Sequence, residues 1–81
     1  MNDRNDRQKM ILDAIAAAEL IRGQAFEATA SLDAIEGARR QLSVATDELR
    51  GQTTATKERV NWLIRELDRL AAQVKALQGK P

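Results

Sequence analysis

The sequence predicts an all-α fold: a long amphipathic heptad-repeat helix that associates with copies of itself as a coiled coil. Two observations support this. From Val60 to Leu77, apolar residues recur at alternating three- and four-residue steps, the spacing of a helix wound around a partner helix. Phe26 and Trp62 are the only aromatic residues. Because aromatic side chains dominate most globular cores, their scarcity favours long helices that pack along seams.

Signals for the two ends of one helix lie near the two ends of the sequence. Asn5 followed by Gln8 can form a capping box, so the helix should begin near Asp6. Gly79 suits the position just after a helix, and Pro81 follows it. We therefore expect a disordered N-terminus over residues 1–5, a single coiled-coil helical domain over 6–78 and a C-terminal tail over 79–81.

The heptad register of the last eighteen residues of this helix extends back to Ile11 without an insertion or a deletion. Only Arg39, Thr46, Thr53 and Thr56 are polar at the a and d positions of this register. Alanines replace leucines along the N-terminal half, so this half should be the weaker one. The predicted self-association seam consists of Ile11, Ile21, Leu32, Ile35, Leu42, Leu49, Val60, Leu63, Leu67, Leu70, Val74 and Leu77.

Residues 51–56, with the sequence GQTTAT, are the weakest part of the predicted helix. A glycine, two threonines at seam positions and an N-cap at Thr53 or Thr54 would suit a turn. The alternative fold is therefore an antiparallel helical hairpin that turns at residues 51–56 and dimerises into a four-helix bundle. A loop has no physical reason to preserve heptad phase, which favours a continuous helix with a weak polar layer here.

The positions that flank the seam do not select one geometry of association. In a parallel dimer, a g residue pairs with the e′ residue five positions on, often with opposite charge. Here Arg59 would face Ile64 and Glu66 would face Ala71, and no such pair joins opposite charges. A homodimer and a tetramer, with parallel or antiparallel helices, both remain open.

Large apolar residues outside the seam are the candidate partner-binding residues. Clusters of exposed aromatic and aliphatic side chains mark interfaces. The alternative is that they pack within the chain or between its copies. These residues are Met10, Leu12, Ile15, Phe26, Trp62 and Ile64.

Arg39, at an a position, and the neighbouring Arg40 are candidates for one of two roles: a polar contact that fixes the register of the coiled coil, or a binding site for an anion. A polar a residue can fix the register of a coiled coil, and two arginines can hold a phosphate or a carboxylate. The favoured alternative is that both arginines reach the surface and pair with Glu36.

Composition argues against several classes of function. The chain has no cysteine and no histidine, which removes disulfides, thiolate nucleophiles and the usual zinc sites. A net charge of +1 creates no strong field toward nucleic acid or an anionic membrane. No phosphate-binding loop, catalytic set or metal-ligand spacing is present. We expect a non-enzymatic cytoplasmic protein with no cofactor, metal, membrane span or small-molecule substrate.

Three functions fit these features. The first is a coiled-coil oligomerisation or adaptor module that acts by helix–helix interaction, with itself or with a helical protein partner. The alternative is a small regulator, such as one encoded by a phage or a plasmid, that docks on a macromolecule through the off-seam apolar residues. The third is a weak nucleic-acid-binding accessory protein, which the near-neutral charge disfavours.

Overall fold

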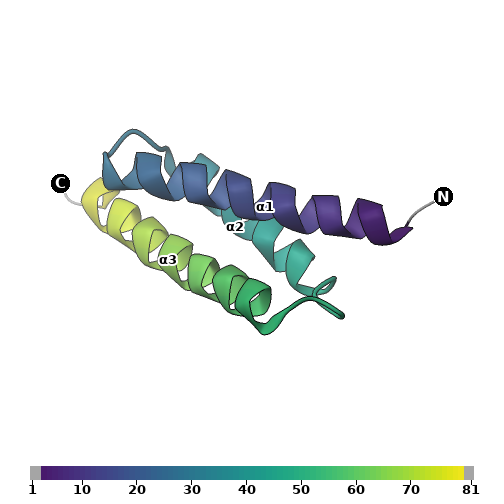
Figure 1. Cartoon of the computed structure of the whole chain (residues 1–81). Coiled ribbons are helices and arrows are strands. Elements are labelled where there is room, and N and C mark those ends of the chain that lie inside the picture. Colours follow the sequence, from purple (N-terminus) through teal and green to yellow (C-terminus); the bar gives the residue numbers. More distant parts are fainter. Residues whose placement is uncertain (1–2, 80–81) are drawn as a thin grey trace.

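The computed structural model describes the backbone of residues 3–79 and the side chains of residues 6–79, and shows three α-helices (Figure 1). Helix α1 spans Asp3–Phe26, α2 spans Leu32–Thr46 and α3 spans Thr54–Gln78. The described part of the chain contains no strand. The all-α class predicted from the sequence is confirmed.

The single continuous helix predicted over residues 6–78 is wrong, because two loops interrupt it. Figure 1 shows that α1 and α3 run in the same direction and that α2 runs back between them. The molecule measures 53 × 22 × 18 Å, whereas an unbroken helix of this length would be about 110 Å long. Residues 3–5 are helical rather than disordered, and residues 1, 2, 80 and 81 lie outside the described part.

The first interruption, at residues 27–31, has no counterpart in the predicted fold. Ala28 adopts a φ of 61°, in the left-handed region. The Thr29 amide and hydroxyl both donate to the Gln24 carbonyl, at 2.8 and 3.0 Å, which caps the exposed C-terminal end of α1. The chain therefore leaves α1 through a left-handed residue that is not glycine.

Replacing Ala28 with glycine is expected to raise the free energy of unfolding by about 1 kcal/mol. Glycine adopts a positive φ without the clash that a Cβ atom causes there. Urea denaturation followed by circular dichroism measures the change. Thr29→Ala is the control, and it should lower stability because it removes the hydroxyl bond to the helix end. A destabilised Ala28→Gly variant would contradict the left-handed conformation.

The start of α2 is encoded locally. Ser31 precedes the helix in an extended conformation, and its Oγ accepts a hydrogen bond from the Ala34 amide at 3.1 Å. Asp33 adds a negative charge to the first turn, where the helix dipole favours it. A serine N-cap followed by an acidic first turn is a recognisable start signal, which the unbroken heptad pattern obscured.

The second interruption, at residues 47–53, overlaps the turn foreseen at residues 51–56. Gly51 has a φ of 85°, a conformation that glycine adopts easily. Thr53 is the N-cap of α3, as the sequence suggested, and its hydroxyl accepts from the Thr56 amide at 3.2 Å. Gln52 donates to the Gln8 side chain at 2.7 Å, which fastens the loop to α1. The weak segment is thus a turn and not a polar layer within a helix.

The core lies between the three helices, and α2 contributes to it in a different phase from α1 and α3. In α1 and α3 the buried residues follow the predicted a and d positions, whereas α2 buries its d and g positions. Arg39 and Thr46, at a positions of α2, consequently lie toward the surface. The buried residues are Ile11, Ala14, Ala18, Ile35, Ala38, Leu42, Ala45, Leu49, Val60, Leu63, Leu67 and Leu70.

Most of the residues predicted to form an intermolecular seam pack inside one chain. Ile21, Leu32 and Val74 are half-buried, and Leu77 is 71% exposed. The other seam residues are buried, namely Ile11, Ile35, Leu42, Leu49, Val60, Leu63, Leu67 and Leu70. The heptad pattern therefore reflects mainly the packing of α1, α2 and α3 against one another within one chain.

Candidate functional site

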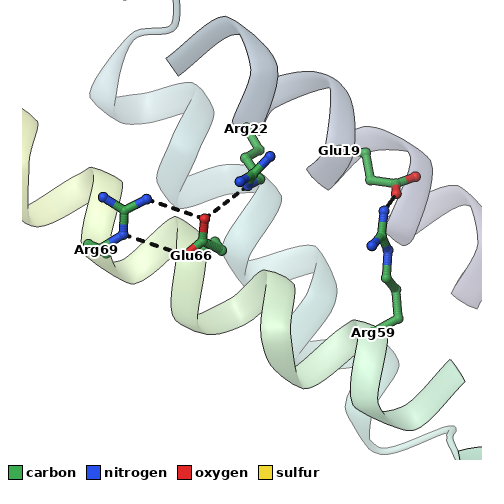
Figure 2. A network of polar contacts seen from close by, with 5 residues as sticks. All are labelled: Glu19, Arg22, Arg59, Glu66 and Arg69. Atoms are coloured by element: carbon green, nitrogen blue, oxygen red, sulfur yellow. Dashed lines mark hydrogen bonds and ion pairs between the residues drawn. The ribbon is translucent and has the colours of Figure 1, made fainter. Parts of the chain in front are cut away.

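Charged side chains of α1 and α3 meet along one side of the bundle (Figure 2). Arg22 of α1 donates through Nε to Glu66 of α3 at 3.0 Å, and Arg69 donates to the same carboxylate at 3.2 Å. One helical turn away on α1, Glu19 pairs with Arg59 of α3. These contacts fix the two parallel helices against each other.

Trp62 lies between two of these arginines. The Arg22 guanidinium carbon is 4.6 Å from the centre of the Trp62 ring, and that of Arg59 is 5.3 Å away. Arg22 also lies 5.5 Å from the centre of the Phe26 ring. All three distances are within the range of a cation–π contact. Trp62 is half-buried against the core, so its ring is already occupied by contacts within the chain.

The Glu66 carboxylate is the titratable group most affected by this arrangement. Hydrogen bonds from Arg69 and Arg22 hold the pKa of Glu66 below its ordinary value of 4.5. A carboxyl group with a lowered pKa in the folded state adds stability above its unfolded-state pKa. That stability is lost as the pH falls through the folded-state value. The contacts between α1 and α3 should therefore weaken in acid.

Glu66→Gln should lower the free energy of unfolding at pH 7. The difference in this free energy between the variant and the wild type, here called the gap, should shrink as the pH falls below about 4.5. The reason is that protonation of Glu66 makes the wild type resemble the variant. Urea denaturation at a series of pH values measures the gap. Arg69→Gln removes one donor and should show a smaller gap with the same pH dependence. A gap that is constant from neutral to acidic pH would contradict this role for Glu66.

The six candidate partner-binding residues do not form one exposed patch. Ile15, Trp62 and Ile64 pack against the core, and Met10 is half-buried. Leu12 and Phe26, by contrast, are 53% and 67% exposed. They lie about 21 Å apart along α1. The structure also exposes Leu20, Val44 and Leu77, which were not among the predicted partner-binding residues.

One side of α1 presents apolar residues to solvent. Leu12, Ala16, Leu20 and Gly23 are four, four and three residues apart, so they share one face of the helix. At about 100° per residue, this face is opposite the one that contributes Ile11, Ala14 and Ala18 to the core. We call these four residues the outer face of α1.

The outer face of α1 is open. Leu12 is 53% exposed and Leu20 is 62% exposed, and Ala16 and Gly23 are exposed as well. A Cβ atom placed on Gly23 would meet nothing within 4 Å. In the middle of α3, from Lys57 to Arg69, every exposed residue is charged or polar, and exposed apolar residues occur only nearer its ends, as at Leu77. Helix α1 therefore carries apolar side chains on two opposite faces, a pattern typical of a helix with neighbours on both sides.

The arginine pair on α2 lines a groove between α2 and α3. Arg39 donates through Nε to Asp68 at 3.0 Å, and Glu36 pairs with Lys75 at 3.3 Å. The expected pairing of Arg39 with Glu36 is therefore wrong, because the fold brings α3 alongside α2. The groove has a volume of about 470 Å³ and includes the exposed side chain of Arg40. Two ion pairs cross it, with alanines of α3 between them.

Among the side chains of residues 6–79, no three acidic groups gather where they could hold a metal ion. None of the described helices has both the length and the apolar character needed to cross a membrane. No family model matches the chain, and neither the curated proteins nor the solved structures show a significant similarity to it. The outer face of α1 is the most distinctive feature of the surface of the bundle.

Proposed function

We propose that the chain is a non-enzymatic helical interaction module that works by self-association into a homodimer. The observation that carries this proposal is the apolar outer face of α1. A surface helix of a monomeric bundle needs one apolar stripe toward its core and a polar opposite face. On α1, two exposed leucines occupy the opposite face, with small residues between and beyond them. Exposed apolar patches of this kind mark interaction surfaces.

The exposed area of the chain supports association. A folded monomer of 9.0 kDa is expected to expose about 4,900 Å², whereas this chain exposes 5626 Å². The excess of about 750 Å² is close to the area that one partner buries in a standard interface, about 800 Å². An elongated bundle can remove this excess from water by placing one long side against a second copy.

The small core of a single chain gives association a thermodynamic benefit. Ala14, Ala18, Ala38 and Ala45 are among the buried residues, and each buries little apolar area. Domains of this size have marginal stability unless disulfides, metals or partner subunits add to it. This chain has no cysteine. Because a second copy that binds only the folded state stabilises that state, dimerisation would supply the missing stability.

Sedimentation equilibrium over a wide range of protein concentration tests the proposal. We expect the mass to rise from 9.0 kDa toward twice that value, and the Tm to rise with concentration in parallel. A mass of 9.0 kDa at every concentration, together with a constant Tm, would refute self-association.

A further inference from the structure

We infer that two copies associate through the outer faces of their α1 helices, packed antiparallel, with Leu20 of each chain seated over Ala16 of the other. This inference rests on the proposed self-association and assigns it a surface and a direction. The opposite face of α1 contributes Ile11, Ala14 and Ala18 to the core shared with α2 and α3, whereas the outer face is exposed, so the outer face can accept a helix along its length.

The shape of the outer face favours an antiparallel partner. Along the outer face of α1, large and small residues alternate in the order Leu12, Ala16, Leu20, Gly23. An antiparallel partner centred at the level of Ala18 places each Leu20 opposite Ala16 and each Leu12 beside Gly23. Side chains interdigitate and helix axes approach closely when large residues face small ones. A parallel partner in register would instead oppose leucine to leucine and leave gaps at Ala16 and Gly23.

The two ends of the outer face carry opposite charges. Lys9 and Glu27 are exposed at the two ends of the outer face, and neither takes part in an ion pair among the described residues. The Glu27 amide donates to the Gly23 carbonyl at 3.2 Å, so Glu27 continues the last turn of α1. The same antiparallel register places Lys9 of one chain opposite Glu27 of the other, and two-fold symmetry forms this pair twice. A parallel arrangement would set like charges against each other.

Two acidic residues flank this face: Asp13, which is exposed and forms no ion pair among the described residues, and Glu19. Glu19 lies at the margin of the outer face and is held toward α3 by its ion pair with Arg59 (Figure 2). Its charge is therefore compensated within the chain before a second copy arrives. Phe26, at the end of α1, is likewise drawn toward Arg22. The centre of the outer face therefore consists of the two leucines and the small residues Ala16 and Gly23.

Leu20→Glu tests the surface. The side chain is 62% exposed in the single chain, so the variant should keep its helical circular dichroism while dimerisation weakens by more than about 100-fold. The effect is large because symmetry introduces the charge twice. Val44→Glu is the matched control, since Val44 is 59% exposed on α2 and lies away from this face. Its dimer dissociation constant should stay within about threefold of the wild type.

Charge reversal tests the direction. Lys9→Glu and Glu27→Lys should each weaken the dimer by roughly tenfold at low salt, because each turns two attractive pairs into repulsive ones. The double variant Lys9→Glu/Glu27→Lys should regain the affinity of the wild type. In a parallel dimer, each single variant would replace one like-charge pair by another and leave the affinity unchanged.

The outcomes separate this inference from the proposed function. A wild-type chain that stays monomeric overturns both. A wild-type dimer that Leu20→Glu does not weaken overturns the α1 surface and leaves self-association standing. A dimer that Leu20→Glu disrupts, but that neither single charge reversal weakens, overturns the antiparallel register.

Discussion

Replacing Leu67 with alanine is expected to lower the free energy of unfolding by about 2–5 kcal/mol. Leu67 is fully buried on α3 and belongs to the core shared with α1 and α2. Removing its side chain loses the transfer free energy of the buried atoms and leaves a cavity that the packed helices can close only in part. For a domain of this size, such a loss is a large fraction of the total stability.

Leu77→Ala is the matched control for this experiment. Leu77 follows the same heptad register on the same helix as Leu67, yet it is 71% exposed. Its replacement should change stability by no more than about 0.5 kcal/mol. Urea denaturation at one fixed protein concentration measures both variants, since dimerisation makes stability concentration-dependent. Equal losses at the two positions would instead indicate a coiled-coil seam that runs to the end of α3.

Ala45→Leu is expected to destabilise the fold by about 1–3 kcal/mol. Ala45 is fully buried on α2, on the stripe that also contains Ala38. Small side chains there let α2 approach its neighbours closely. A leucine at this position would force side chains out of their preferred rotamers or push the helices apart.

The phase of α2 is what the Ala45→Leu experiment tests. Ser43→Leu, at an exposed position of the same helix, is the control and should leave stability nearly unchanged. If α2 kept the register of a continuous coiled coil, Ala45 would flank the seam and Thr46 would lie within it. Thr46→Leu would then stabilise the chain and Ala45→Leu would be nearly neutral, contrary to the structure.

Several features of the fold could be predicted from the sequence because they depend on local chemistry. The scarcity of aromatic residues and the apolar spacing from Val60 to Leu77 predicted helices, and all three elements are helical. Thr53 and Thr54 were the two candidate N-caps of the alternative turn, because a threonine hydroxyl can accept from an amide of the first helical turn, and Thr53 is the one that does so. Leu63 and Leu67 were placed on one apolar stripe because of their spacing; the prediction assigned this stripe to a seam between chains, whereas α3 buries it within one chain.

The folding back of the chain could not be read from the heptad pattern. Ile35 and Leu42 are d positions of the continuous register, and they are equally part of the shifted stripe that α2 buries. The two registers therefore share their large residues. The two registers make different predictions only at residues such as Ala45, which is buried, and Arg39, which lies toward the surface. A small residue and a charged residue indicate the buried face of a helix less clearly than a large apolar residue does.

The surface features depend on tertiary structure to different degrees. Leu12 was identifiable as an apolar residue outside the seam. The role of Leu20 depends on knowing which side of α1 faces the other helices, and that side follows from the fold. The pair between Arg22 and Glu66 joins residues 44 positions apart, so no local pattern could indicate it. The same holds for the pair between Arg39 and Asp68.

The most direct test of this account is the distance between nitroxide labels on Gln8→Cys and Gln52→Cys in one chain, measured by electron resonance after dilution with unlabelled protein. The chain has no other cysteine to label. Because the Gln8 and Gln52 side chains are hydrogen-bonded at 2.7 Å, we expect the labels to lie within about 20 Å of each other. A continuous helix would hold them about 66 Å apart, and that distance would contradict the three-helix fold.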